Sequence, residues 1–401
     1  MIDIKIKRDC CGCSACVQKC PRECILLKED NEGFLYPEVE KSTCVNCGLC
    51  EKVCPFINVG TLRKPMDTYA AKCLDENIRK RSSSGGIFTL LGKKVIESGG
   101  VVFGARFNET WEVVHDYTET EEGLDAFCGS KYVQSRVGDA YIQTERFLKQ
   151  GRMVLFSGTP CQIRGLRLFL RQDYKNLFTV DFICHGVPSP KVWREYLNEA
   201  IMMPEHEECE KKSTLVLNPL SAIKSINFRD KYLGWKEYSI VIQGNFTGQA
   251  DKNTVLLSDM HINNPFMKVF LSDLILRPSC YDCKTKGGRS GSDITIADFW
   301  GIQNIMPEFD DDKGVSAVMI NNYQGEEFIK AIKEYIECYN ILYTDVLKYN
   351  PAFEKSSIEP KSRLDFFNSR STIKEKAKKY CKKNLIQRIL ASTLKVRQIF
   401  K

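Results

Sequence analysis

The distribution of hydrophobic and polar positions between residues 87 and 337 predicts strands and helices that alternate along the chain. Short apolar runs bounded by turn residues indicate buried strands, whereas apolar residues spaced by three or four indicate helices with one buried face. Strands are predicted at residues 101–105, 153–156, 178–183, 225–228, 238–243, 294–297 and 315–320. Helices are predicted at residues 87–98, 190–203 and 325–337, and in a segment that ends near residue 170. We therefore expect a mixed-sheet α/β body that includes some antiparallel strands.

Residues 1–60 follow a different pattern, which is dominated by cysteines. Ten of the 19 cysteines lie within the first 54 residues. The spacing C-x2-C-x2-C-x3-C-P occurs twice, from Cys10 to Pro21 and from Cys44 to Pro55. Between the two runs, residues 25–37 predict a short hairpin with a polar turn at 29–33. This is the pattern of a two-cluster bacterial ferredoxin domain.

The repeated spacing suits two iron–sulfur cubes that exchange one ligand. Three thiolates on one tight loop can reach three corners of a cube, and the fourth, held apart by three residues and a proline, points to the other cube. The spacing therefore predicts one [4Fe–4S] cluster on Cys10, Cys13, Cys16 and Cys54, and a second on Cys20, Cys44, Cys47 and Cys50. Structural zinc prefers two separated cysteine pairs, which fits this arrangement poorly. Cys11 and Cys24 fall outside the spacing and are predicted to take no part.

Composition and charge indicate a folded chain with a basic C-terminal end. Of its 401 residues, 43% are hydrophobic and 27% are charged, which excludes wholesale disorder. The sequence has no run of 18 apolar residues and no apolar leader, so we expect a cytoplasmic protein whose cysteines serve as metal ligands or redox groups. Residues 371–401 hold ten Lys or Arg and one acidic residue, so this segment contributes +9 to a net charge of +7 and the rest of the chain contributes −2.

The basic segment alternates apolar and basic positions at helical intervals, which predicts a basic amphipathic helix. Such a helix can lie on the anionic inner face of a membrane, can dock an acidic partner, or can be a solvated chain end. The body contains no nucleic-acid motif, so we expect no nucleic-acid partner.

Three loops at predicted element ends have the composition of ligand sites. Residues 82–86, three serines and two glycines ahead of a helix, suit a phosphate, although a plain helix cap has the same composition. Residues 129–135 place Lys131 among small polar residues, which suits a phosphate, an electron-rich ring or a solvated turn. Residues 158–162 join a strand to a helix, where α/β sheets commonly bind ligands. No dinucleotide-binding or P-loop glycine pattern occurs, so a nucleotide cofactor must be held in another way.

Four cysteines of the body lie close to predicted loops. Cys161 and Cys184 each follow a predicted strand, and Cys280 and Cys283 form a C-x2-C pair. Strand ends can converge at one rim of a sheet, where four thiolates would ligate a third [4Fe–4S] cluster. Spacing alone does not distinguish this arrangement from buried cysteines without a ligand.

Six motifs together resemble one known family. They are Ser83-Ser-Gly-Gly86, Gly129-Ser-Lys-Tyr132, Phe156-Ser-Gly-Thr-Pro-Cys-Gln162, Cys184-His-Gly-Val-Pro-Ser-Pro190, Arg277-Pro-Ser-Cys-Tyr-Asp-Cys283 and Asp293-Ile-Thr-Ile-Ala-Asp-Phe-Trp-Gly301. Over roughly residues 5–350 the chain is similar to the coenzyme F420 hydrogenase/dehydrogenase beta-subunit family. The resemblance implies FAD in the body and electron transfer between iron–sulfur clusters and a hydride carrier or substrate. The resemblance also favours a third [4Fe–4S] cluster, held by the four cysteines of the body described above.

The resemblance further implies that the serine- and lysine-containing loops belong to a flavin pocket. The cofactor-binding residues would be Ser83, Ser84, Gly85, Gly86, Ser130, Lys131, Gly158 and Thr159. Of these, Ser84, Gly85 and Gly86 would hold the pyrophosphate. Lys131, the one residue given a catalytic role, would stabilise negative charge on the reduced flavin ring.

Taken together, the predictions describe a ferredoxin domain at residues 1–60, a flavin and iron–sulfur body at 61–366 and a basic tail at 367–401. We expect an oxidoreductase that passes electrons between [4Fe–4S] clusters, FAD and either an F420-like deazaflavin coenzyme or a small substrate, with a redox partner protein. Two alternatives are left open: a reductase in a cell-surface polysaccharide or lipid-linked sugar pathway, and a non-catalytic electron-transfer subunit of a larger complex.

Overall fold

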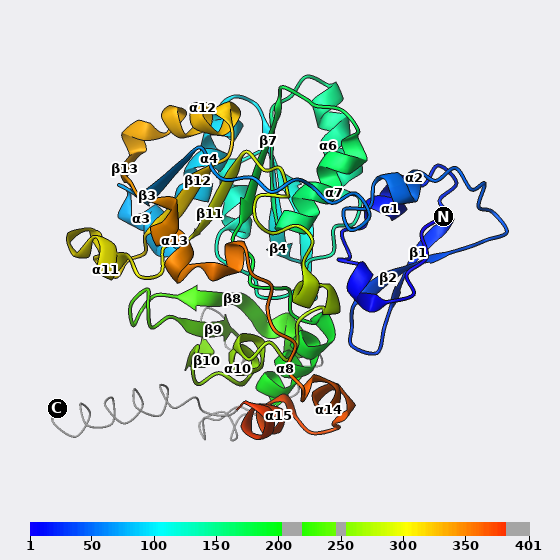
Figure 1. Cartoon of the computed structure of the whole chain (residues 1–401). Coiled ribbons are helices and arrows are strands. Elements are labelled where there is room, and N and C mark those ends of the chain that lie inside the picture. The colour runs from blue at the N-terminus through cyan, green and yellow to red at the C-terminus, as the bar shows by residue number, and fades with distance from the viewer. Residues whose placement is uncertain (203–218, 246–253, 382–401) are drawn as a thin grey trace.

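A small N-terminal module lies beside a large body in the computed structural model, which describes residues 1–202, 219–245 and 254–381. In Figure 1 the module is drawn in blue at the side of the body, and a second, smaller sheet lies below the main sheet. Both parts of the body follow the mixed α/β organisation expected from the hydrophobic pattern, which is thereby confirmed.

The body is built on an eight-stranded mixed sheet within the described residues. In spatial order its strands are β13 (Ile336–Asn340), β3 (Asp67–Cys73), β12 (Ser316–Ile320), β11 (Ile294–Asp298), β7 (Leu177–Phe182), β6 (Val154–Gly158), β4 (Val101–Phe107) and β5 (Val113–Thr118). The central strands β11, β7, β6 and β4 are mutually parallel, and the outer pairings are antiparallel. Parallel strands end at one rim of the sheet, so the loops after β6, β7 and β11 start there.

Helices cover both faces of this sheet because the strand residues are apolar on both sides. On β4, Val101 and Phe103 pack with α6 (Ala140–Lys149) and α7 (Pro160–Leu170). Val102, whose side chain points the other way, packs with α4 (Ile87–Glu97) and α12 (Tyr323–Ala331). Shorter helices beside this sheet are α3 (Glu76–Arg81), α5 (Glu121–Leu124), α11 (Ile302–Ile305) and α13 (Tyr343–Tyr349).

The smaller sheet has its own core. Its antiparallel strands are β8 (Ile223–Asp230), β9 (Ser239–Gly244) and β10 (Thr254–Met260). They pack with α8 (Pro190–Met202) and α10 (Pro265–Leu271) around Trp193, Phe228 and Phe266, all of which are buried. The small sheet is therefore held against the rim of the main sheet rather than extending it.

The predicted helix at residues 325–337 is wrong at its C-terminal end. Helix α12 stops at Ala331, and the chain then forms a short 3₁₀ turn and strand β13. Strand β13 pairs with β3, a strand that the sequence pattern did not predict. Because Ile332 and Ile336 are buried on the sheet, tertiary packing outweighs the local helical spacing.

The N-terminal module contains the predicted hairpin. Strands β1 (Ile25–Glu29) and β2 (Leu35–Val39) pair in antiparallel register, and two short helices, α1 (Ala15–Gln18) and α2 (Leu49–Lys52), each begin within a cysteine run. The hairpin turn is held by the body, because Arg363 of α14 (Arg363–Asn368) pairs with both oxygens of Glu32 at 2.7 and 2.5 Å. Lys191 donates to the Asn31 carbonyl at 2.9 Å.

Part of the predicted basic tail packs on the body. Helix α15 (Ile373–Tyr380) contacts α10, and Ile373 and Ala377 are buried. These apolar side chains therefore face protein and are unavailable to a lipid surface. The rest of the predicted tail helix, residues 382–401, lies outside the described residues. Among the residues that the structure describes, no helix has the length and apolar character required to cross a bilayer.

Candidate redox site

Four ferredoxin thiols, the proximal thiol site, lie together on the side of the module that faces the body. They are the predicted group Cys10, Cys13, Cys16 and Cys54, of which Cys16 interacts electrostatically with each of the other three. Burial, together with the nearby Cys10 and Cys54 thiolates, raises the pKa of Cys16. A Cβ atom on Gly165 of α7 would come within 3.1 Å of the Cys13 sulfur, so the module rests closely on this helix.

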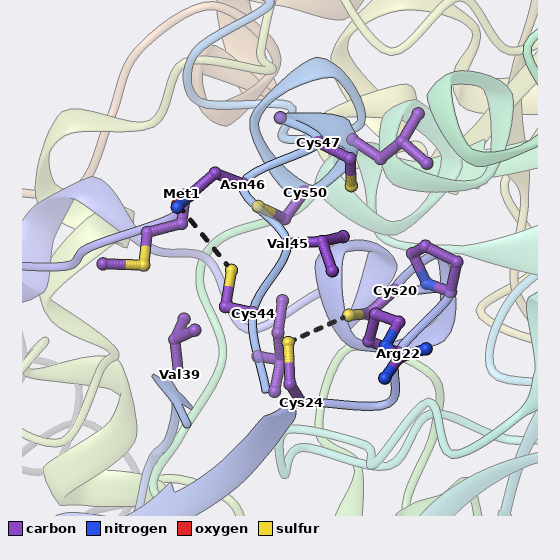
Figure 2. A pocket seen from close by; sticks show the side chains of 14 residues that line it. Met1, Cys20, Arg22, Cys24, Val39, Cys44, Val45, Asn46, Cys47 and Cys50 are labelled. Atoms are coloured by element: carbon purple, nitrogen blue, oxygen red, sulfur yellow. Dashed lines mark hydrogen bonds between the residues drawn. The ribbon is translucent and has the colours of Figure 1, made fainter. Parts of the chain in front are cut away.

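The remaining four ferredoxin thiols, the distal thiol site, surround a small hollow farther from the body. Figure 2 shows Cys20, Cys44, Cys47 and Cys50 around it. The Ile2 amide donates to the Cys50 sulfur at 3.2 Å, and Cys47 is exposed. Amide contacts of this kind tune the potential of a cluster, and an exposed edge gives a partner access to it.

The two cysteine runs have matching backbone turns. Ser14 and Gly48 both adopt left-handed conformations, with φ of 63° and 71°, immediately before α1 and α2. Gly12 and Asn46, two residues earlier, are also left-handed. In each loop the two left-handed residues flank the second predicted ligand, Cys13 in the first run and Cys47 in the second. The sequence repeat is therefore also a structural repeat. The chemistry of eight thiols on two equivalent loops fits two [4Fe–4S] clusters.

The four predicted body thiols, here the body thiol site, come together at the rim of the main sheet. Cys161 lies in the first turn of α7, Cys184 follows β7, and Cys280 and Cys283 lie in and just after a 3₁₀ helix at Pro278–Asp282. Burial and the nearby Cys161 and Cys283 thiolates raise the pKa of Cys184 to about 12. Burial and the thiolates of Cys184 and Cys283 likewise raise the pKa of Cys280.

A set of half-buried thiols that oppose one another's ionisation fits a multi-iron cluster, because iron balances the thiolate charge. The Val187 amide donates to the Cys280 sulfur at 3.4 Å, as is usual around cluster ligands. Within the described residues, no three Cys, His, Asp or Glu side chains are placed to share a single metal ion. A cube has four separate iron corners, so its ligands spread wider than those of one ion.

Cys11 connects the proximal and body thiol sites, although the spacing predicted no part for it. Hydrogen bonding to Cys13 and burial raise the pKa of Cys11, and hydrogen bonding to Cys11 and burial raise that of Cys161. Cys11 is thus in contact with a predicted ligand of each site. No spacing rule could have identified it, because its partner lies 150 residues away along the chain.

The main pocket of the body adjoins the body thiol site. Its volume is about 560 Å³, which is within the range of small-molecule and cofactor sites. Cys184 is part of its lining, as is the β6–α7 turn from Ser157 to Thr159. Seven of the eight predicted cofactor residues line it: Ser83, Ser84, Gly86, Ser130, Lys131, Gly158 and Thr159.

Gly85 is the exception among the predicted cofactor residues. It does not line the main pocket, and its amide donates to the Ser316 hydroxyl at 2.9 Å. A Cβ atom at this position would overlap the Ala71 carbonyl. The amide is therefore not free for a phosphate, and the glycine instead lets the loop pass close to β3 and β12.

The two predicted loops meet at the pocket. The Ser130 amide donates to the Ser83 hydroxyl at 2.6 Å, and the two hydroxyls are 2.8 Å apart. Helix α4 begins directly after Gly86, and no side chain caps its first amides. An uncapped helix N-terminus that faces a pocket suits an anionic group such as a pyrophosphate.

Lys131 is half-buried on the pocket wall. Its ammonium donates to the carbonyls of Ala126 at 2.7 Å and Cys128 at 2.9 Å, so one of its three N–H donors is left for a ligand. Burial lowers the pKa of Lys131 to about 8. The side chain therefore stays positively charged at pH 7, as its predicted role requires.

His115 is a pocket residue that the sequence analysis missed. Its Nε2 lies 3.0 Å from the Ser157 carbonyl and its Nδ1 lies 2.9 Å from the Ser135 hydroxyl. The carbonyl can only accept, so the proton is assigned to Nε2 and the Ser135 hydroxyl donates to Nδ1. Burial lowers the pKa of His115 to about 4, which keeps the ring neutral. A single histidine within β5 gives no local signal of this position.

The small sheet supplies the opposite wall of the pocket. Arg229 of β8 pairs with both oxygens of Asp298, at 2.7 and 3.1 Å, and donates to the Ser83 carbonyl at 3.2 Å. Its guanidinium lies 4.1 Å from the Tyr238 ring centroid and 5.3 Å from that of Trp300. This wall is aromatic and its cation is already paired, which suits a planar ring.

Comparisons with known proteins agree with this architecture. The C-terminal model for the coenzyme F420 hydrogenase/dehydrogenase beta subunit matches residues 151–341, and the N-terminal model matches residues 68–140. A 4Fe-4S dicluster domain matches residues 9–58. No curated protein matches the chain.

Among solved structures, the chain is similar to one from the xenon-derivatised F420-reducing [NiFe] hydrogenase complex of Methanosarcina barkeri. The identity is 16%, the match covers 72% of this chain and 91% of that chain, and the TM-score is 0.46. The two halves of one family description match consecutive parts of the body. The chain therefore belongs to the coenzyme F420 hydrogenase/dehydrogenase beta-subunit family and carries a 4Fe-4S dicluster domain in its N-terminal module.

Proposed function

We propose that this chain is an iron–sulfur flavoprotein oxidoreductase that transfers electrons between the clusters of its N-terminal module and a hydride acceptor in the main pocket. The observation that carries the proposal is the contact between thiols and pocket. Cys161 follows the pocket-lining residues Gly158 and Thr159 in the same turn, and Cys184 itself lines the pocket. A cluster on the body thiol site would therefore border any ligand bound there.

The chain offers a continuous series of redox positions. The distal thiol site has an exposed cysteine, the proximal thiol site faces the body, and Cys11 contacts both Cys13 and Cys161. Electrons would enter or leave at the distal thiol site and pass through the proximal and body thiol sites. The Glu32–Arg363 ion pair supports this order because it keeps the module docked with the proximal thiol site facing the body.

The main pocket would hold FAD. The free amides at the start of α4, with Ser83 and Ser130, would bind its pyrophosphate, and Lys131 would place a positive charge beside the ring. Bound there, a flavin would combine two single electrons and a proton into a hydride equivalent. The aromatic wall formed by Tyr238 and Trp300 would take a planar acceptor, such as an F420-like deazaflavin or another small substrate.

Anaerobic purification with iron, sulfide and flavin analysis tests the proposal. Three four-iron clusters give an expected content of about twelve irons and one FAD per chain. Cys280→Ser should retain about eight irons because one cluster loses a ligand. The control Cys338→Ser, on strand β13 outside the three thiol sites, should retain the full content. A colourless, flavin-free protein would contradict the proposal.

A second measurement separates an enzyme from a non-catalytic electron-transfer subunit. The purified chain is reduced with dithionite and offered an F420-like deazaflavin or an artificial two-electron acceptor. Turnover by the isolated chain supports an oxidoreductase. Full cofactor content without turnover on any acceptor would instead assign the chain an electron-transfer role within a larger complex.

A further inference from the structure

Arg277 is a fully buried arginine that reaches from the body into the N-terminal module. Its Nε donates to the Cys10 carbonyl at 2.7 Å and its Nη2 donates to the Leu35 carbonyl at 2.8 Å. The same Nη2 lies 3.5 Å from the Cys10 sulfur, and Nη1 donates to Gln134 at 3.0 Å. The side chain is 0% exposed, so its charge is wholly removed from water.

None of the carbonyl and amide groups that bond to Arg277 carries a negative charge that could neutralise its guanidinium. Its partners are two carbonyls, one amide and one thiol, and the rings of Tyr36 and Phe34 lie 4.3 and 5.4 Å from the guanidinium. Within the described ranges, the other three buried arginines each pair with a carboxylate: Arg79 with Asp311, Arg229 with Asp298 and Arg363 with Glu32. A buried cation without an anion is strongly unfavourable. The nearest group that can supply negative charge is the Cys10 thiolate.

The chain makes room for this contact. Gly12 has a left-handed backbone, and a Cβ atom there would lie 2.7 Å from Nη1 and 2.9 Å from Cζ of Arg277. The first loop of the proximal thiol site therefore accommodates both the left-handed turn and the guanidinium only with glycine at this position. Arg277 also stands three residues before Cys280, so one segment serves both the proximal and the body thiol sites.

We propose that Arg277 is the built-in counterion of the cluster at the proximal thiol site and raises the reduction potential of that cluster. The inference rests on the proposed function for the presence of the cluster, but not on FAD or on the acceptor. A reduced cluster carries one more negative charge than an oxidised one. A fixed positive charge beside a ligand sulfur therefore favours the reduced state. Arg277 is a positioning residue, because it acts through Cys10.

The test is an EPR-monitored redox titration of the full-length, anaerobically reconstituted protein. In Arg277→Gln the reduction potential of one cluster, that of the proximal thiol site, should fall by at least about 59 mV, which is a tenfold change in the equilibrium of a one-electron couple. The potentials of the other clusters should stay unchanged. Arg277→Lys keeps the charge with fewer donors and should restore most of the parent potential. Arg363→Gln is the control for docking: it also removes a buried arginine between module and body and breaks the Glu32 ion pair, but Arg363 bonds to no thiol, so a shift confined to Arg277→Gln reports the charge beside Cys10.

Unchanged potentials in Arg277→Gln at full iron content would overturn the proposal, and so would an equal shift of every cluster. If Arg277→Gln loses iron, its potentials cannot be compared with the parent's, and Arg277→Lys then distinguishes a counterion from a purely structural residue. If Arg277→Lys retains all clusters near the parent potentials, the counterion role is supported. If Arg277→Lys also loses iron, Arg277 has only a structural role. Flavin content and turnover of the parent protein report separately on the proposed function, so the two can fail independently.

Discussion

Replacing Gly33 with alanine should loosen the docking of the N-terminal module on the body. Gly33 closes the β1–β2 turn with a left-handed backbone, and a Cβ atom there would overlap the Cβ of Lys191 and lie 2.7 Å from the Lys191 amide nitrogen. Lys191 lies in the first turn of α8 and cannot yield without moving that helix. The hairpin turn must therefore move away, together with the Glu32–Arg363 ion pair.

The magnitude has two parts. A left-handed alanine costs about 1–2 kcal/mol relative to glycine. The overlap adds an overpacking cost of about 1–3 kcal/mol. Gly99→Ala isolates the first part, because Gly99 also has a left-handed backbone, with φ of +73°, and a Cβ there would meet no atom within 4 Å. The difference between the two variants should be about 1–3 kcal/mol, or roughly five- to 150-fold in the opening equilibrium of the hairpin.

Hydrogen–deuterium exchange measures this opening locally, which matters because a chain with several modules and clusters does not unfold in one step. Peptides that cover β1 and β2 should exchange faster in Gly33→Ala, whereas in Gly99→Ala only peptides around the end of α4 should change. Reduction of the pocket ligand by electrons from the module should also slow in Gly33→Ala alone. Equal hairpin exchange in Gly33→Ala and the parent would refute the proposed docking contact.

Three further predictions concern charged groups. Burial raises the pKa of Asp181 from 3.8 to about 6. Between pH 3.8 and 6 the folded state therefore keeps a proton on Asp181 that the unfolded state has released. The free energy of unfolding should fall by about 3 kcal/mol as the pH rises across this window. Thermal melts from pH 4 to 7 should show no such loss of stability in Asp181→Asn. If stability changed with pH in the same way in the variant and the parent, the role of Asp181 would be contradicted. Asp293 accepts from Thr179 and Arg167, and Asp293→Ala should cost about 1–3 kcal/mol, because the buried Thr179 amide loses its side-chain acceptor and Arg167 loses its carboxylate partner. A melting temperature equal to that of the parent would rule this out. Because the pKa of Lys131 is about 8, the flavin potential should fall more steeply as the pH rises through this value in the parent protein than in Lys131→Met, where only the flavin's own proton uptake contributes. Anaerobic spectroelectrochemistry measures both slopes, and equal slopes in the two proteins would contradict the role of Lys131.

Features that are encoded locally could be predicted from the sequence. The apolar runs of β4, β6 and β7 are continuous and bounded by turn residues, so their strands were found within a few residues. The two cysteine runs define their own loops, because each carries three predicted ligand thiols within seven residues. The convergence of Cys161 and Cys184 followed from one rule, that parallel strands end at the same rim.

Features that depend on distant partners could not be predicted. Strand β13 forms because β3 offers a sheet edge, although the spacing of its residues suits a helix. His115 and Arg229 acquire their roles only where β5 and β8 approach the pocket loops. Gly85 had the right composition for a phosphate loop, but its amide is bonded to Ser316, 231 residues later in the chain. Each of these depends on an approach in space that leaves no periodic signal.

The junction of β6 and α7, from Ser157 to Gln162, borders both the main pocket and the body thiol site. Ser157, Gly158 and Thr159 border the main pocket, and Cys161 of the body thiol site follows two residues after Thr159, so a cluster held there would be separated from a pocket ligand by a short stretch of backbone. The wall that would contact a planar acceptor comes instead from Arg229 of β8, Tyr238 next to β9 and Trp300 after β11. A substitution at Arg229 or Tyr238 would therefore reshape that wall while the four thiols behind it keep their positions.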